Sequence, residues 1–172
     1  QSMGGVDALS SYDILKNKCA WGNLNDPHVY VDPESLNNSV RPKTNLMRVA
    51  QSFADQGKNK EAVEMLDVYM KYFPDEKVPF DMYMLPYAEI YYKAGAPEKA
   101  NKLLERIAEI CGQNIDYYHG FSAAYTQYFD EDIQTTMGIL KRLSMVASQN
   151  KQTELAAKLD AMFNEKLKFF NP

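Results

Sequence analysis

Two stretches of the chain share one pattern: Gly57–Pro74 reads GKNKEAVEMLDVYMKYFP, and Gly95–Gly112 reads GAPEKANKLLERIAEICG. Each stretch opens with glycine, continues through a short polar run, and then places an alanine, a leucine and a third apolar residue at helical spacing. Gly57 and Gly95 set a period of 38 residues. An internal repeat of this length is typical of supersecondary units that bury their apolar faces on one another. The sequence therefore predicts an all-α fold of stacked antiparallel helical hairpins.

Length and composition narrow the class of protein. The chain has 172 residues, 45% of them apolar, which suffices for one core of ordinary size. Its net charge of −4 comes from interspersed acids and bases, so no basic face is expected and nucleic acid is excluded as a partner. No apolar run approaches the roughly 18 residues of a membrane span, so we expect a soluble chain. Residues 1–5 resemble the remnant of a cleaved tag with a disordered start, and we expect a single domain over 6–172.

The reactive side chains form no recognisable catalytic or metal-binding pattern. Cys19 and Cys111 are too few for a disulfide framework; one bridge between them stays open, although two free thiols are favoured. His28 and His119 are the only histidines and lack the spacing of a zinc site. Cys111 and His119 lie close in sequence, but no third residue is evident to orient a base. We therefore expect no catalytic residues, no metal and no cofactor.

The periodicity places helices along most of the chain. A helix over 7–19 precedes a structured loop, and three hairpins are predicted at about 44–73, 81–111 and 132–168. Asp32 and Pro33 are typical of a helix start, and Pro42 is expected to end or kink that short helix. Pro86 predicts a late start or a kink in the second hairpin, whose return helix is expected to end at Ile110.

The apolar positions before each glycine resemble those of the tetratricopeptide repeat, a helix-turn-helix unit with a small residue where its helices cross. The period is four residues longer than the family's 34, Tyr69 replaces a small residue, and Gly112 stands where proline is expected. The resemblance implies a right-handed superhelical array, with an irregular helix and loop at its N-terminal end. The matching residues are Leu46, Val49, Ala50, Phe53, Ala62 and Leu66 in the first copy, and Met84, Tyr87, Ala88, Tyr91, Ala100 and Leu104 in the second.

A second resemblance is carried by short phrases in a fixed order. They are Trp21-Gly22-Asn23, Val29-Tyr30-Val31-Asp32, Pro74-Asp75-Glu76-Lys77-Val78-Pro79, Met84-Leu85-Pro86 and Tyr91-Tyr92-Lys93-Ala94-Gly95. Together they look like the C-terminal soluble region of a family of multi-spanning bacterial membrane proteins of unknown function, whose membrane part is similar to protein O-mannosyltransferases. The resemblance implies an extracytoplasmic (periplasmic) module of a glycosyltransferase-like parent, with the parent's catalytic acids outside this chain.

Tyrosines are the candidate functional residues. Three tyrosines, Tyr83, Tyr87 and Tyr91, recur at helical spacing. Tyrosine is favoured at binding surfaces, where its ring contacts apolar groups and its hydroxyl contacts water or a polar partner. Core packing is favoured for Tyr87 and Tyr91 because they occupy repeat positions. The predicted function is a non-catalytic interaction or scaffold module that binds a protein, a peptide or its own parent's membrane part; the alternative is binding of a carbohydrate or acceptor substrate. The candidate partner-binding residues are Tyr83, Tyr92, Tyr117, Tyr118 and Tyr125.

Overall fold

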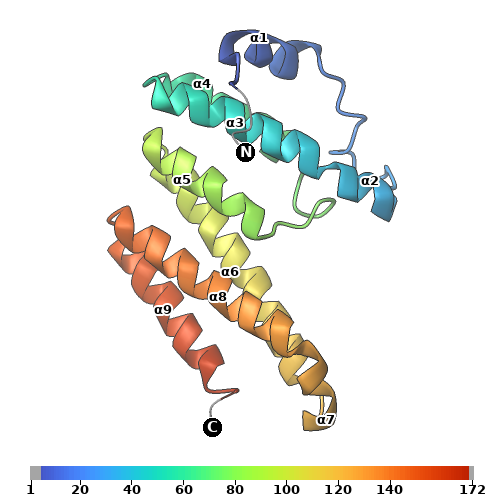
Figure 1. The fold of residues 1–172 in the computed structure, drawn as a ribbon, viewed down its shortest axis with the longest axis vertical. Helices are drawn as coiled ribbons and strands as arrows, with labels where there is room; N and C mark the ends of the chain where they lie inside the picture. Colours follow the sequence, from blue (N-terminus) through green and yellow to red (C-terminus); the bar gives the residue numbers. More distant parts are fainter. Residues whose placement is uncertain (1–4, 171–172) are drawn as a thin grey trace. The chain divides into compact units, whose positions relative to one another are not determined.

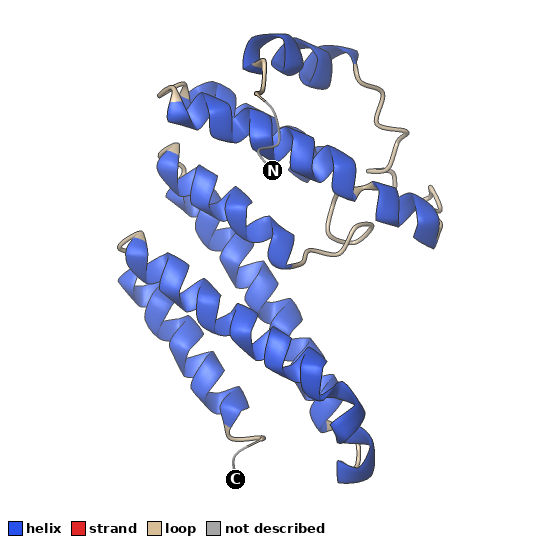
Figure 2. Cartoon of the chain, in the orientation of Figure 1, coloured by secondary structure: helices blue, strands red, loops and turns tan. Residues whose placement is uncertain are grey.

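A computed structural model describes residues 5–170, so the expected tag remnant lies outside the described residues except for Gly5. Within that range every regular element is a helix (Figure 2), and the described chain is all-α. The backbone forms two compact units. Unit 1 comprises residues 5–79 and 86–97, and unit 2 comprises residues 80–85 and 98–170.

The helices of each unit follow the predicted order. Unit 1 contains α1 (Ala8–Asp13), a π-helical turn (Ile14–Lys18), α2 (Pro33–Asn38), α3 (Val40–Asp55), α4 (Asn59–Tyr72) and most of α5 (Leu85–Lys93). Unit 2 contains a 3-10 turn (Met82–Met84), α6 (Pro97–His119), α7 (Ala123–Thr126), a second 3-10 turn (Gln127–Phe129), α8 (Asp130–Gln149) and α9 (Thr153–Leu167). Within their units, α3 with α4 and α8 with α9 form antiparallel hairpins (Figure 1).

The turn between α3 and α4 is built around Gly57. This glycine has φ = 73°, a conformation that residues with a Cβ rarely adopt. It allows the Lys58 amide to donate to the Phe53 carbonyl at 2.9 Å, and the Gly57 amide to the Ala54 carbonyl at 3.2 Å. These bonds satisfy carbonyls at the end of α3, as in a Schellman motif. Gly95 repeats the arrangement after α5, with φ = 76° and a 2.8 Å bond from the Ala96 amide to the Tyr91 carbonyl.

The hairpin of α8 and α9 ends its first helix in the same way without glycine. Lys151 has φ = 61°, and the Gln152 amide donates to the Ala147 carbonyl at 2.9 Å. Counted from this turn, Ser144 takes the small-residue position, and its hydroxyl donates to the Ala156 carbonyl of α9 at 3.3 Å. The first helix and the turn of this hairpin therefore repeat those of the first hairpin. Leu140, Leu143, Ser144 and Ala147 are buried at the positions that Leu46, Val49, Ala50 and Phe53 hold in α3.

The first tyrosines of α5 belong to the core of unit 1, as favoured by the sequence. Tyr87 is fully buried and donates to the Lys43 carbonyl of α3 at 2.7 Å. Tyr91 donates to Asp67 of α4 at 2.9 Å. The Tyr69 and Tyr87 rings lie 5.2 Å apart, so Tyr69 fills core volume where the family has a small residue. Burial, followed by the neighbouring Tyr69 and Tyr91, raises the pKa of Tyr87 well above its usual value.

Two helix boundaries differ from the sequence predictions. Pro42 neither ends nor kinks a helix; it lies in the first turn of α3, where its missing N–H needs no intrahelical partner. The return helix of the second hairpin continues past Ile110 and through Gly112 to His119. The buried Cys111 and Ile115 keep the helical spacing of Leu104 and Ile107, so apolar burial outweighs the roughly 1 kcal/mol preference of glycine against a helix interior.

The N-terminal part of unit 1 is tied down at several points. Asp7 caps α1 by accepting from the Ser10 amide, and Asp32 caps α2 as predicted. In the loop between these helices, Trp21 stacks on Tyr72 with ring centroids 6.0 Å apart. Lys77 donates to the Val29 carbonyl at 2.7 Å, which fixes the loop to the segment after α4.

Candidate functional site

The five candidate tyrosines do not form one cluster among the described residues. Tyr83 lies in the 3-10 turn of unit 2 and is 62% exposed, whereas Tyr92 lies on α5 in unit 1 and is half-buried. Tyr117 and Tyr118 are adjacent at the end of α6, with ring centroids 5.7 Å apart. Tyr125 lies in α7 and is 64% exposed. The structure therefore brings only Tyr117 and Tyr118 into ring contact.

These two tyrosines belong to a larger group that we call the aromatic tip, defined as Tyr117, Tyr118, Phe121 and Phe129. Tyr117 meets Phe121 edge to face at 5.0 Å, and Phe121 stacks on Phe129 at 5.1 Å. Phe129 also stacks on Tyr118 at 5.2 Å. Such pairs add to area burial and fix the chain where α6 turns toward α8. Burial, with smaller effects from Asp132 and Tyr117, raises the pKa of Tyr118, which stays a neutral phenol.

A cavity of about 420 Å³ lies beside the aromatic tip. His119 at the end of α6 stacks on Phe169, just after α9, with ring centroids 4.3 Å apart. Asp130, the first residue of α8, supplies the carboxylate of the cavity. The residues that line the cavity are His119, Phe121, Thr126, Gln127, Asp130, Phe169 and Phe170.

Sequence reasoning missed the Phe169 and Phe170 side of this cavity. The sequence signal was present as two consecutive aromatic residues at the end of the last helix. Their meeting with His119, fifty residues earlier in the chain, depends on how α9 lies along α6. Asn101 donates to Gln152 at 2.9 Å, and Lys166 donates to Asp116 at 2.5 Å, so polar pairs fix that arrangement at both ends.

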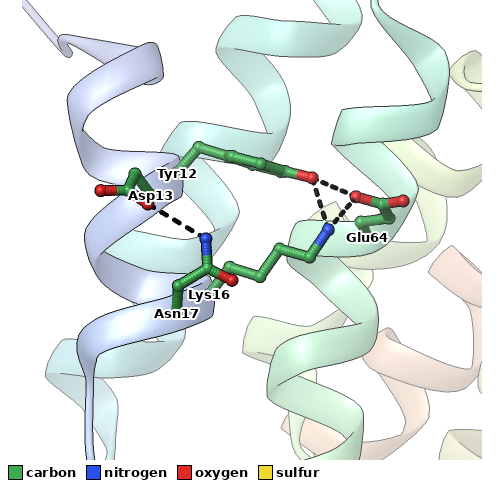
Figure 3. Close-up of polar contacts among 5 residues, drawn as sticks. All are labelled: Tyr12, Asp13, Lys16, Asn17 and Glu64. Carbon is green, nitrogen blue, oxygen red and sulfur yellow. Dashed lines mark hydrogen bonds and ion pairs between the residues drawn. The ribbon is translucent and has the colours of Figure 1, made fainter.

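A second polar cluster holds the N-terminal helix on unit 1 (Figure 3). Tyr12 donates to the Glu64 carboxylate of α4, and Lys16 donates to the same carboxylate at 2.6 Å and to the Tyr12 hydroxyl at 2.6 Å. The bonds from Lys16 and Tyr12 lower the pKa of Glu64. The Tyr12 ring also packs edge to face on Phe53 at 5.5 Å. This cluster fixes α1 to the first hairpin.

The remaining reactive groups are placed for packing or solvent contact. Burial raises the pKa of Cys111 to about 11, so its thiol is a poor nucleophile at neutral pH. Cys19 and Cys111 are both free thiols. His28 is exposed and lies 3.1 Å from Asp26. Over residues 5–170, no group of three or more His, Cys, Asp or Glu side chains is arranged to hold a metal ion.

Comparison with known families matches one segment. Residues 44–76 match the family model of the tetratricopeptide repeat, which covers α3 from Thr44 onward, the Gly57 turn and α4. Neither the comparison with curated proteins nor that with solved structures finds a match. The match agrees with the hairpin geometry, and tetratricopeptide repeats generally mediate protein–protein contacts without catalysis. None of the helices described here combines the length and apolarity needed to cross a bilayer.

Proposed function

We propose that this chain is a non-catalytic interaction module that binds a protein or peptide partner. The observation that carries the proposal is the tetratricopeptide-type hairpin of α3 and α4, which matches the family over 44–76. Its turn geometry recurs at Gly95 and Lys151. Helical hairpins of this kind use their cores for architecture and leave surface side chains to bind partners.

The partner contacts proposed for this module are the candidate tyrosines. Tyr83, Tyr117 and Tyr125 are 62%, 63% and 64% exposed, and tyrosine gives large contact area at low entropic cost. Tyr92 and Tyr118 are half-buried, so each offers a partner only part of its side chain. Burial raises the pKa of Tyr92 to about 12, so it presents a neutral hydroxyl.

Site-specific photocrosslinking in cells that express the chain tests this proposal. A photoreactive phenylalanine replaces Tyr83, Tyr117 or Tyr125 in separate variants, and Tyr30 is the matched control because it is 84% exposed and lies outside the candidate set. We expect a discrete crosslinked partner from at least one candidate position and none from Tyr30. Absence of a crosslink from all three positions, in correctly folded variants, would contradict the proposal.

We also propose that the chain is appended, on the extracytoplasmic side, to a glycosyltransferase-like membrane protein. The ordered phrases from Trp21-Gly22-Asn23 to Tyr91-Tyr92-Lys93 support this assignment. The parent's membrane part is then a partner in its own right. The direct test reads the coding region upstream of residue 1 for several apolar spans and places a topology reporter on this chain. A cytoplasmic reporter signal would refute the assignment.

A carbohydrate or an acceptor substrate is the second candidate ligand. The cavity beside the aromatic tip favours it, because aromatic rings with a few polar groups are a common setting for sugar binding. The polar groups in its lining are those of His119, Thr126, Gln127 and Asp130. Titration with methyl glycosides, followed by amide chemical shifts of His119, Phe121 and Phe169, tests this candidate. No shift at millimolar concentration would eliminate it.

A further inference from the structure

We propose that the cavity beside the aromatic tip binds a cationic side chain, arginine or lysine, presented by a partner protein. The inference rests on the proposed interaction function and names the chemistry of one contact. It concerns unit 2 alone, and four observations carry it: the charge of the segment, the pairing of its acids, the rings around the cavity, and a basic side chain already held in the same way nearby.

The segment that forms the aromatic tip accounts for the entire net negative charge of the chain. Residues 107–140 contain five acidic residues and no lysine or arginine, so their formal charge is −5 while the complete chain has −4. The rest of the chain is therefore +1. A cationic partner would be attracted to this end of unit 2, because surface charge steers association.

Pairing within unit 2 leaves the cavity's acid available. Arg106 donates to Glu109 at 3.0 Å, and Lys166 donates to Asp116 at 2.5 Å, which neutralises two of the five acids. Within the described chain, Asp130 has no ion-pair partner, and it lines the cavity. A position in the first turn of α8 suits a carboxylate electrostatically, but this does not explain why aromatic rings surround it.

The rings around Asp130 suit a cation. Phe121, Phe169 and Phe170 line the same cavity, and the faces of phenyl rings attract guanidinium and ammonium groups. The volume of about 420 Å³ accommodates a long side chain. The cavity suits a sugar less well, because a sugar needs several hydrogen-bonding partners. The Thr126 hydroxyl already donates to the Ser122 carbonyl at 3.1 Å, and a carboxylate is the dominant polar group among the rest.

The protein itself shows the contact at this end of the unit. The Lys166 ammonium lies 5.2 Å from the centroid of the Phe169 ring while it pairs with Asp116 at 2.5 Å. A basic side chain is thus held between an aromatic ring and a carboxylate. The cavity offers the same combination to a partner, with Asp130 as the carboxylate and the neighbouring rings as the aromatic component.

Titration of the isotope-labelled full chain with acetyl-Gly-Gly-Arg-Gly-Gly-amide tests the inference. Citrulline in place of arginine gives a neutral control peptide of nearly the same shape. We expect amide shifts confined to 117–132 and 166–170, with millimolar affinity, and binding of the citrulline peptide at least about threefold weaker.

Two variants localise the contact. Asp130→Asn should weaken the arginine peptide about threefold to fivefold, as expected for an ion pair at an exposed carboxylate. The adjacent Glu131→Gln should change affinity less than about twofold because Glu131 does not line the cavity. Phe170→Leu should weaken binding about threefold through loss of a ring face that lines the cavity. Unchanged far-UV circular dichroism confirms that each variant is folded.

Several results would overturn the inference. These are equal affinity for both peptides, shifts outside the tip, no shift at about 10 mM peptide, or shifts at the tip with a methyl glycoside but not with arginine. The last result would favour the carbohydrate candidate instead. In all four cases a crosslinked partner at Tyr83 or Tyr125 would still support the interaction function, so failure of this inference and failure of that function remain distinguishable.

Discussion

The first hairpin, α3–α4, and the last, α8–α9, show how one turn geometry arises from different residues. Both end their first helix with a residue at positive φ, but that residue is Gly57 in one hairpin and Lys151 in the other. A left-handed conformation costs a residue with a Cβ roughly 1–2 kcal/mol. The turn is therefore set by packing where the helices cross, at the small residues Ala50 in α3 and Ser144 in α8. Glycine only lowers the free-energy cost of its left-handed conformation.

The hairpins also differ on their return helices. Leu66 of α4 is fully buried, whereas the equivalent position of α9 is Asp160, which pairs with Lys141 at 2.9 Å. The last hairpin thus replaces one core contact with a surface ion pair. It shares the first helix and the turn of the repeat, but only part of the second helix.

The largest expected effect tests whether both first helices form equivalent cores. Leu46→Ala and Leu140→Ala should each lower the free energy of unfolding by about 2–5 kcal/mol, because both side chains are fully buried. Urea unfolding measures the loss. Met145→Ala is the control on α8, since Met145 is 45% exposed, and it should cost less than about 0.5 kcal/mol. A cost below about 1 kcal/mol for Leu140→Ala would show that α8 is no counterpart of α3.

Exchange of the turn residues should produce effects of opposite sign. Gly57→Ala should destabilise by about 1–2 kcal/mol through backbone strain alone, since a Cβ there would meet nothing within 4 Å. Lys151→Gly should stabilise by about 0.5–1 kcal/mol, because relief of strain exceeds the added freedom of the unfolded chain. Thermal unfolding of the pair measures both changes. The same sign for both variants would refute a shared turn conformation.

The Tyr12–Lys16–Glu64 cluster predicts that the attachment of α1 to the first hairpin depends on pH. The pKa of Glu64 is lowered below its usual 4.5 by Lys16 and Tyr12, so its contribution is complete above that value and is lost as the pH falls through the lowered pKa. Hydrogen exchange should show α1 opening on acidification before α3 and α4 do. Glu64→Gln should reduce the pH dependence of α1 protection in this window, and the part that remains is due to the Asp7 cap, whose pKa is lowered by its bonds from Ser10. An unchanged pH profile in that variant would rule out Glu64 as the titrating group.

The smallest effect concerns the ion pair that replaces a core contact in the last hairpin. Lys141→Ala should change the free energy of unfolding by less than about 1 kcal/mol, since Lys141 and Asp160 are both more than 40% exposed. The change should vanish at high salt, where surface charges are screened. Urea unfolding at two salt concentrations measures it. A larger, salt-independent loss would mean that Asp160 contributes to the core as Leu66 does.

The sequence identified two residues of the aromatic tip as candidates, but it did not identify the aromatic residues that complete the neighbouring cavity. Tyr117 and Tyr118, which follow the predicted second hairpin, were among the candidate partner-binding residues. The part of the cavity formed by Phe169 and Phe170 was missed because Phe169 contacts His119, fifty residues earlier in the sequence. Local periodicity carries no information on contacts between residues so far apart in the sequence. Binding of a partner by these residues stays a prediction.

Short-range rules determined the helices and their caps. Helical spacing gave the buried faces of α3 and α5, Asp32 gave a cap, and Gly57 and Gly95 gave turns, because each depends on residues within about one helical turn. The tertiary structure alone decided two features. Lys151 adopts a glycine-like conformation because packing of Ser144 against Ala156 outweighs local strain, and α6 continues through Gly112 because burial of Ile115 outweighs glycine's low helix propensity.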